Sequence, residues 1–219
     1  MKLNATIAFT WLVIAVLVAS SQLITRRITS DEELSRGQNL LEVVVAGIQR
    51  QIREIAADDP GRYLSFVGTL FLFIVAANLL TIVPGYQPPT GSLSTTVALA
   101  LCVFVAVPAY GISRRGVRGY LRQYTQPSLI MLPFNIIGEF SRTLALAVRL
   151  FGNVMSGTLI VAVLIGLAPL FFPIVMQAFG LLIGVIQAYI FAVLAMVYIA
   201  SGTRVQEERR EPPTPLSEV

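Results

Sequence analysis

The chain has 219 residues, of which 55% are hydrophobic and 13% are charged, and its mean hydropathy is +0.75. Water-soluble domains are far less apolar, so this composition indicates an integral membrane protein. The single cysteine, Cys102, excludes an internal disulfide, and the absence of histidine removes the commonest general base and metal ligand. These features argue against metalloenzymes and nucleophilic triads, and we expect no catalytic residue, no metal site and no cofactor in this chain.

Five apolar segments follow one another along the chain. A helix needs about 20 residues to cross ~30 Å of hydrocarbon, so the first three segments fit single spans. The last two are too long, because the 39 residues from 129 to 167 would form a helix of roughly 58 Å. No proline falls between Pro133 and Pro169, so we expect a steeply tilted helix and a similarly long partner after a turn. We predict an all-α membrane protein, one polytopic domain over 1–219, with spans at 3–21, 63–83, 95–112, 129–167 and 171–200.

The positive charges predict how these spans are oriented. Thirteen of the 16 Lys and Arg residues fall between spans one and two, between spans three and four, or after span five. The loops 84–94 and 168–173 carry none, and only Lys2 belongs to the opposite face. Because short cytoplasmic loops are enriched in Lys and Arg, we expect the N-terminus outside and the C-terminus in the cytoplasm.

A cleaved signal peptide is the alternative interpretation of the first segment. Lys2 precedes an apolar core, and small residues follow at Ala19 and Ser20. Cleavage there would require the segment that carries Arg26 and Arg27 to cross the membrane. A retained first span agrees better with these charges.

Residues 39–55 lie between the first two spans and have apolar side chains at helical spacing, with charged residues such as Glu42 and Arg50 interleaved. This pattern predicts an amphipathic helix on the cytoplasmic surface of the membrane. A soluble loop helix that packs on nothing in particular is the alternative. The tail at 205–219 is rich in charge and proline, so we expect it to be flexible. The sequence has no internal repeat, which disfavours an inverted-repeat transporter.

Three charged residues, Glu139, Arg142 and Arg149, fall inside the long apolar segments, and all three belong to the fourth. A charge near the bilayer centre costs at least ~2.5 kcal/mol, so such residues normally face protein or water and mark a pathway. An ion pair between Glu139 and Arg142 near the cytoplasmic side is an equally good explanation for those two. Arg149 has no acidic residue later in the spans, so we expect its partner on another subunit.

Small and polar residues share the helical face of Arg149. Ala145, Gly152, Asn153 and Ser156 recur at three- and four-residue spacing from it, and they would let another helix or water approach the guanidinium. The fifth span offers a matching stripe, for which ordinary small-residue helix packing is the alternative: Gln177, Gly180, Gly184 and Gln187.

The segment from Arg149 to Asn153 reads RLFGN, within PFNIIGEFSRTLALAVRLFGNVMSG, and it resembles the signature of subunit a of F-type ATP synthases. Residues 69–101 are similar to that family's second span, outer PPT loop and third span. QNLLE at 38–42 is similar to its surface helix, and IQAYIFAVLAMVYIA at 186–200 is similar to its last span. Together these segments cover most of the chain in the family's order.

The resemblance implies a stator subunit that carries ions past a rotating ring of carboxylates. Arg149 matches the family's stator arginine, Asn153 the asparagine one turn later, and Gln187 the glutamine that faces it. Asn78 and Glu139 match polar positions of the outer and inner aqueous half-channels, respectively. Further half-channel candidates are Arg142, Ser156, Thr158 and Gln177.

The resemblance also implies the partners and the location. We expect the c-ring, subunit b of the peripheral stalk, the peripheral ATPase sector and the lipid bilayer as partners, and no nucleic acid. The chain has no glycine-rich phosphate loop with its lysine, so we expect no nucleotide site and no enzymatic activity of its own. The expected location is the bacterial plasma (inner) membrane.

The sequence departs from the family pattern at two positions. Many members carry a glutamate nine residues after the stator arginine and a histidine seven residues before the last-helix glutamine, sometimes exchanged. Here Thr158 and Gly180 occupy these places, so the usual titratable relay is missing. Water held by Thr158, Gln177 and Asn78 could carry either protons or sodium ions. This departure, the short N-terminus and the Pro/Glu/Arg tail resemble the alternate N-type ATPase branch, for which sodium is the expected ion.

Two other classes of function compete with this interpretation. A secondary transporter could use Arg149 to bind an anionic substrate, but it predicts broken helices, a pocket and activity by the isolated chain. A membrane scaffold without a transport role would leave the unpaired central arginine unexplained. Co-purification with an oligomeric ring and a peripheral ATPase separates the three classes.

Overall fold

The computed structural model describes residues 5–26, 36–55, 61–83, 85–125, 131–167 and 172–204. Within these residues there is no strand, and five helices are long and apolar enough to cross a membrane. The expected all-α membrane class is therefore confirmed, whereas the predicted tail at 205–219 lies outside the described residues. The elements are α1 (Ala5–Arg26), α2 (Arg36–Ile55), α3 (Gly61–Leu79), η1 (Leu80–Ile82), η2 (Pro89–Gly91), α4 (Leu93–Thr125), α5 (Met131–Leu167) and α6 (Phe172–Arg204).

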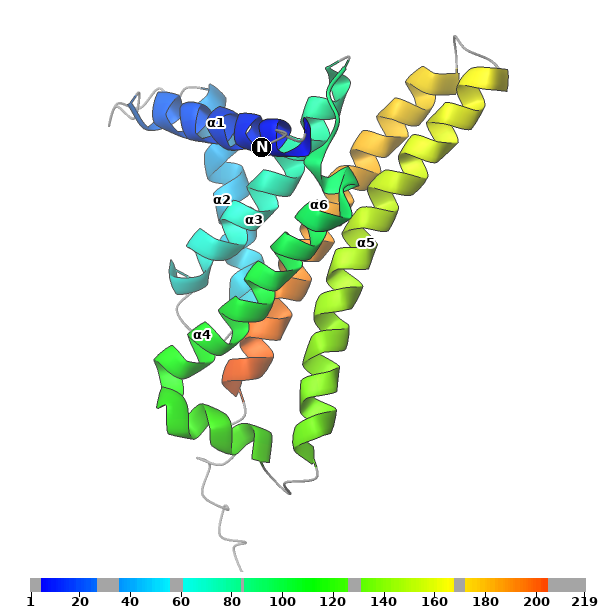
Figure 1. Cartoon of the computed structure of the whole chain (residues 1–219). Coiled ribbons are helices and arrows are strands. Elements are labelled where there is room, and N and C mark those ends of the chain that lie inside the picture. Colours follow the sequence, from blue (N-terminus) through cyan, green and yellow to red (C-terminus); the bar gives the residue numbers. More distant parts are fainter. Residues whose placement is uncertain are drawn as a thin grey trace, which may run out of the picture.

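Each of the two longest apolar segments forms one continuous helix. α5 has 37 residues and α6 has 33, so they extend roughly 55 and 50 Å, well beyond the ~30 Å of a bilayer core. Their prolines, Pro133 and Pro173, lie in the first turn, where the missing N–H breaks no helical hydrogen bond. Figure 1 shows α5 and α6 side by side as an antiparallel hairpin that runs obliquely to α1.

α4 extends beyond the predicted third span. The helix continues to Thr125 through Gly116, whose φ of 71° and ψ of 163° are not helical. Glycine tolerates this positive φ because it has no Cβ, so the chain turns sharply there. The segment after Gly116 runs across the lower end of the bundle in Figure 1. The sequence prediction ended the span at 112 because hydropathy falls there, yet arginine is a good helix former and the helix continues.

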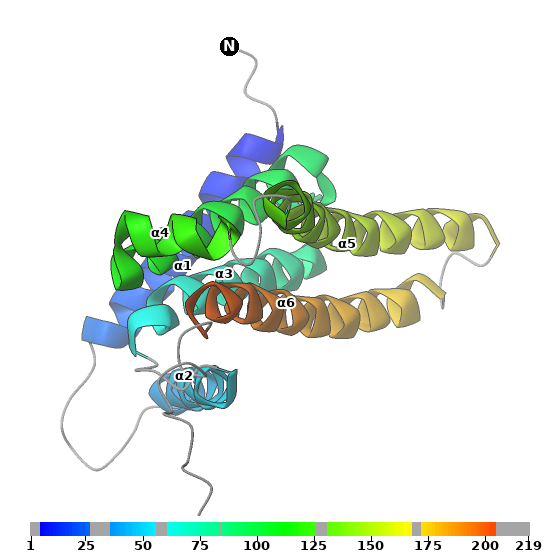
Figure 2. The same cartoon turned by 90° about the horizontal axis from the view of Figure 1, so that it is seen from below.

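α2 lies to one side of the other helices and is seen end-on in Figure 2, where it adjoins α3 and α6. Its Ile52 is only 1% exposed and belongs to a hydrophobic cluster that includes Tyr63, Met196 and Ile199. The Tyr189 hydroxyl on α6 donates a hydrogen bond of 2.8 Å to the side-chain oxygen of Gln51. The apolar stripe of α2 thus packs on the bundle. This argues against the alternative interpretation, a soluble loop helix that packs on nothing in particular.

The hydrophobic core is built mainly by α3, α4 and α6. A second cluster continues from the first and includes Ile74, Val103, Leu150 and Phe191. α5 contributes little to this core, because the buried ones among its described side chains are Leu146, Ala147 and Leu150. Most of α5 therefore presents apolar side chains that no described residue of this chain covers.

Candidate functional site

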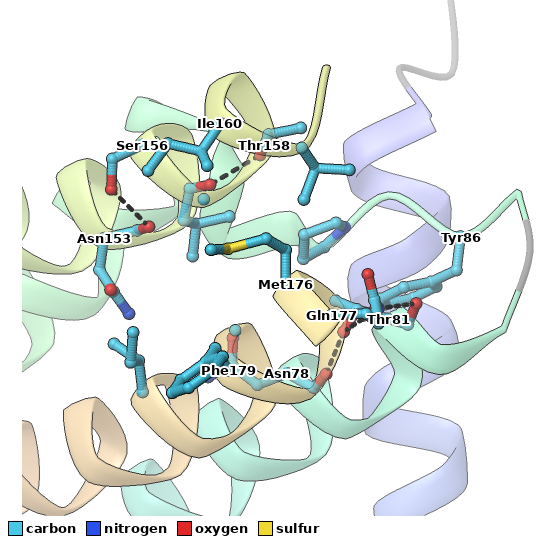
Figure 3. A pocket seen from close by; sticks show the side chains of 16 residues that line it. Asn78, Thr81, Tyr86, Asn153, Ser156, Thr158, Ile160, Met176, Gln177 and Phe179 are labelled. Atoms are coloured by element: carbon cyan, nitrogen blue, oxygen red, sulfur yellow. Dashed lines mark hydrogen bonds between the residues drawn. The ribbon is translucent and has the colours of Figure 1, made fainter. Parts of the chain in front are cut away.

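A cavity of about 290 Å³ lies between α3, α5, α6 and the loop that follows η1. Figure 3 shows Tyr86, Thr81 and Gln177 at one end of it and Asn153 and Ser156 at the other. Five of the residues predicted from the sequence line this cavity together, although they come from three helices: Asn78, Asn153, Ser156, Thr158 and Gln177. Sequence reasoning missed Thr81 and Tyr86. Thr81 follows Asn78 by three residues, so helical spacing was a signal that could have found it.

Asn78 holds α3 close to α6. Its side chain is 6% exposed, and its Nδ2 donates a hydrogen bond of 3.1 Å to the Gly184 carbonyl. A Cβ on residue 184 would lie 2.8 Å from the Asn78 Cγ, which is closer than real Cβ atoms come. Glycine at 184 is therefore required by the close approach of the two helices. The contact fixes the Asn78 side chain at the wall of the cavity.

Gln177 makes a second link between α6 and the end of α3. Its Nε2 donates to the Thr81 carbonyl at 2.8 Å and lies 3.4 Å from the Thr81 hydroxyl oxygen. The Thr81 hydroxyl in turn donates to the Asn78 carbonyl at 2.6 Å. Carbonyls at a helix end lack partners within the helix, and Gln177 satisfies one of them. This network gives the end of the cavity near the loop a fixed set of polar groups.

Two hydroxyls on α5 line the opposite wall. Ser156 donates to the Asn153 carbonyl at 3.0 Å, and Thr158 donates to the Val154 carbonyl at 2.6 Å. Each hydroxyl has a single hydrogen, which these bonds use, so the oxygen lone pairs remain as acceptors. Gly180 faces the same cavity, and a Cβ there would meet no atom within 4 Å. Thr158 and Gly180, the two positions that depart from the family pattern, thus line one space.

The described residues that line the cavity include one titratable group, the phenol of Tyr86. Burial raises the pKa of Tyr86 from 10.0 to about 12, so this hydroxyl stays protonated and neutral across physiological pH. The other polar lining groups are amides and hydroxyls, whose hydrogen-bonding capacity does not change with pH in this range. The cavity is uncharged, and its amides and hydroxyls lie among apolar side chains such as Val154, Met176 and Phe179.

Arg149 and Gln187 lie outside the lining of the cavity but near it along their helices. Arg149 precedes the lining residue Asn153 by four residues, a rise of about 6 Å. Its side chain is exposed, and it makes no hydrogen bond or ion pair with the described residues. Gln187 is 7% exposed, and its buried Nε2 has no hydrogen-bond partner within the described part of the chain. Both side chains offer donors that the described residues leave unused.

Glu139 and Arg142 lie toward the start of α5, away from the cavity. The Arg142 guanidinium carbon is 5.6 Å from the ring centroid of Tyr198 on α6, a cation–π geometry. No ion pair joins Glu139 to Arg142 in the described parts of α5, so the pairing considered from their spacing is not formed. The aromatic ring holds Arg142 instead, and Glu139 remains half-buried.

The chain matches the family model described as ATP synthase A chain over residues 7–200. It belongs to this family. A protein called ATP synthase subunit a 2 from Acaryochloris marina is 63% identical over 216 residues, which cover 99% of this chain and 92% of the relative. ATP synthase subunit a from Albidiferax ferrireducens is 59% identical over 212 residues, covering 97% and 92%. Membership of the ATP synthase A chain family, together with five long apolar helices, makes this chain a multi-pass membrane protein.

Proposed function

We propose that this chain is the stator subunit a of a rotary ATP synthase, where it carries ions past a ring of carboxylate-bearing c subunits. The observation that carries the proposal is the uncharged cavity with its amide and hydroxyl groups, which begins at the loop before η2 and ends one helical turn from Arg149. A path for ions and a positive charge that no described residue pairs with are thus adjacent on α5. The family and the names of its relatives support the same role.

The cavity serves as the outer half-channel in this proposal. The ring of Phe9, near the start of α1, packs on Tyr86 at 5.0 Å, so this end of α1 and the loop lie together. The cluster around Ile52, Tyr63 and Ile199 lies at the other end of the bundle, next to the arginine-rich segments. The positive-inside rule then supports an N-terminus outside, a C-terminus in the cytoplasm and a cavity that opens outward.

The exposed face of α5 is the surface that would meet the c-ring. It carries Arg149, and Arg142 seven residues earlier lies two turns away on the same face. Other faces of α5 carry large exposed apolar side chains, including Phe140, Leu144 and Val148. A ring of apolar helices with a carboxylate at mid-membrane would cover this surface and supply the partner that Arg149 lacks among the described residues.

The chemistry of the step is electrostatic. A ring carboxylate is neutral while it faces lipid, because it holds a proton or a sodium ion. Near Arg149 the ion leaves, since a fixed positive charge favours the bare carboxylate. Arg149 also prevents a direct leak, because a free cation would have to pass it in a site of low dielectric constant. Glu139, Arg142 and Gln187 would serve the reloading path on the cytoplasmic side.

The geometry of the hairpin supports a steep tilt. α5 and α6 run obliquely to α1 in Figure 1. If α1 crosses the bilayer, two helices longer than the hydrocarbon thickness are accommodated by tilting, and they follow the curved flank of a ring.

We propose sodium as the coupling ion, together with membership of the N-type branch. The support is the set of neutral oxygen ligands in the cavity and the position of Thr158 and Gly180 on its wall. The proposed assembly includes the c-ring, subunit b and the peripheral ATPase sector, which holds the catalytic sites, in a bacterial plasma membrane. If ion-substitution measurements show transport without sodium, the coupling ion is the proton, carried through ordered water.

The test is Arg149→Ala in the assembled complex, reconstituted in vesicles. ATP-driven ion transport should fall to background while the complex still assembles, because the charge that discharges the ring carboxylate is gone. Arg118→Ala is the matched control, since Arg118 is an exposed arginine after the kink of α4, and it should transport normally. Near-normal transport by Arg149→Ala would remove the central claim. Anion transport by the isolated chain would favour a secondary transporter instead.

A further inference from the structure

Tyr86 lies at the loop end of the cavity, where Figure 3 shows it beside Thr81 and Gln177. We infer that its hydroxyl is a fourth hydroxyl ligand of the outer half-channel, which with Thr81, Ser156 and Thr158 selects a small monovalent cation or hydronium over an anion. This inference rests on the proposed function and names a residue and a selection mechanism for it. Neither the motifs nor the family pattern pointed to Tyr86.

The position of Tyr86 is built by its neighbours. Gly85 has a φ of +86°, which glycine adopts readily, and the Tyr86 N–H donates to the Val83 carbonyl at 3.1 Å to close the turn. The Phe9 ring meets the Tyr86 ring edge to face, with centroids 5.0 Å apart and planes at 75°. α1 therefore braces the phenol against the mouth of the cavity.

Tyr86 lines the cavity, and its hydroxyl oxygen is buried and has no hydrogen-bond partner among the described residues. Leaving a buried polar group without a partner is unfavourable, so such groups are nearly always satisfied. The cavity is the space that Tyr86 lines, and we therefore expect its hydroxyl to turn toward an ion that passes through. Its pKa of about 12 keeps it neutral, so it acts as a ligand and not as a proton carrier.

The other three hydroxyls explain the preference for a cation. Thr81, Ser156 and Thr158 each donate their hydrogen to a backbone carbonyl. What they present to the cavity is lone pairs, which stabilise a cation and repel an anion. Neutral oxygen ligands are also the kind that hard monovalent cations accept when they lose part of their water shell. Selection by charge thus needs no carboxylate in this cavity.

Tyr86→Phe tests the ligand, because it removes one oxygen and keeps the ring that packs on Phe9. In the reconstituted complex we expect ATP-driven transport to fall roughly threefold to tenfold at low Na⁺. Recovery at high Na⁺ identifies sodium as the ion, and an equal loss at every Na⁺ concentration identifies hydronium. Tyr110→Phe is the matched control, since the Tyr110 hydroxyl contacts the Arg62 carbonyl at 3.5 Å, far from the cavity. Wild-type transport by Tyr86→Phe at all Na⁺ concentrations overturns the inference.

Thiol labelling tests the selection by charge without relying on activity. Tyr86→Cys in a Cys102→Ala background, which removes the exposed native thiol, is treated from the outside with cationic and anionic thiol reagents of equal size. Mass spectrometry should show faster modification by the cationic reagent. Equal or faster modification by the anionic reagent overturns the selection mechanism.

Two further variants separate this inference from the function on which it rests. Thr158→Val removes one of the three hydroxyls that α5 and η1 supply, and Thr69→Val removes a hydroxyl with the same kind of backbone bond outside the cavity. If Thr158→Val lowers transport and Tyr86→Phe does not, the role of Tyr86 is wrong and the half-channel stands. If Arg149→Ala still transports, the proposed function itself fails.

Discussion

The two halves of the α5/α6 hairpin use different chemistry. The half near the end of α5 and the start of α6 encloses an uncharged cavity whose polar side chains bond to backbone carbonyls, as Asn78 does to Gly184 and Gln177 to Thr81. The opposite half carries Glu139 and Arg142, and an aromatic ring holds the arginine. Arg149 lies between them, exposed. If the proposed function holds, the difference teaches that one helix pair uses fixed neutral ligands on one side of the membrane and charged groups on the other.

Among the variants that test this difference between the two halves, Gly184→Ala should have the largest effect on transport. The added Cβ would lie 2.8 Å from the Asn78 Cγ and 3.0 Å from its Cβ, so either the helices separate or Asn78 leaves the wall. Overpacking of this kind typically costs about 1–3 kcal/mol, and we expect ATP-driven transport to fall roughly tenfold. Gly166→Ala is the control, because a Cβ at 166 meets nothing within 4 Å. Normal transport by Gly184→Ala would mean that the Asn78 contact is dispensable.

Gly180→His should make the neutral half resemble the charged half. The side chain has room, since a Cβ at 180 faces open space in the cavity. An unperturbed histidine has a pKa of about 6.5, so below this pH it is positive and repels the transported cation. Transport relative to the wild type should therefore fall as the pH is lowered from 8 to 5.5 and recover as the pH rises.

The control for this pH dependence is Gly166→His, whose side chain also has free space but lies outside the cavity lining. Its transport relative to the wild type should be the same at both pH values. A flat ratio for Gly180→His as well would show that ions do not pass this part of the wall.

The smallest effect should come from the charged half, through Tyr198→Leu. Removing the ring frees Arg142 from a cation–π contact of 5.6 Å, which is worth about 0.5–1 kcal/mol at an exposed site. That energy corresponds to a roughly twofold to fivefold decrease in the population of molecules whose Arg142 is correctly positioned. Transport should fall by a similar factor. Tyr198→Phe keeps the ring and should behave like the wild type; equal losses in both variants would point to the hydroxyl instead.

Much of the fold was predictable because the signals for it are local. Hydropathy over about 20 residues predicts a span, and the absence of proline between Pro133 and Pro169 indicated one long helix, as α5 is. Helical spacing placed Asn153 and Ser156 on the face of Arg149, and the structure brings both to the cavity. The kink of α4 was not predicted, because the positive φ of Gly116 depends on where the following segment packs and not on the sequence around it.

The sequence by itself determined the class of molecule, the unpaired arginine and most of the polar residues around it, since composition and periodicity act through neighbours along the chain. Only the tertiary structure decided which of these residues share a cavity. Asn78 and Gly184 are 106 residues apart, and their contact exists because glycine lets α3 and α6 approach closely. Tyr86 reaches the cavity through a turn at Gly85 and a brace from Phe9 on α1. Such distances follow from how helices pack in three dimensions, which no local pattern in the sequence encodes.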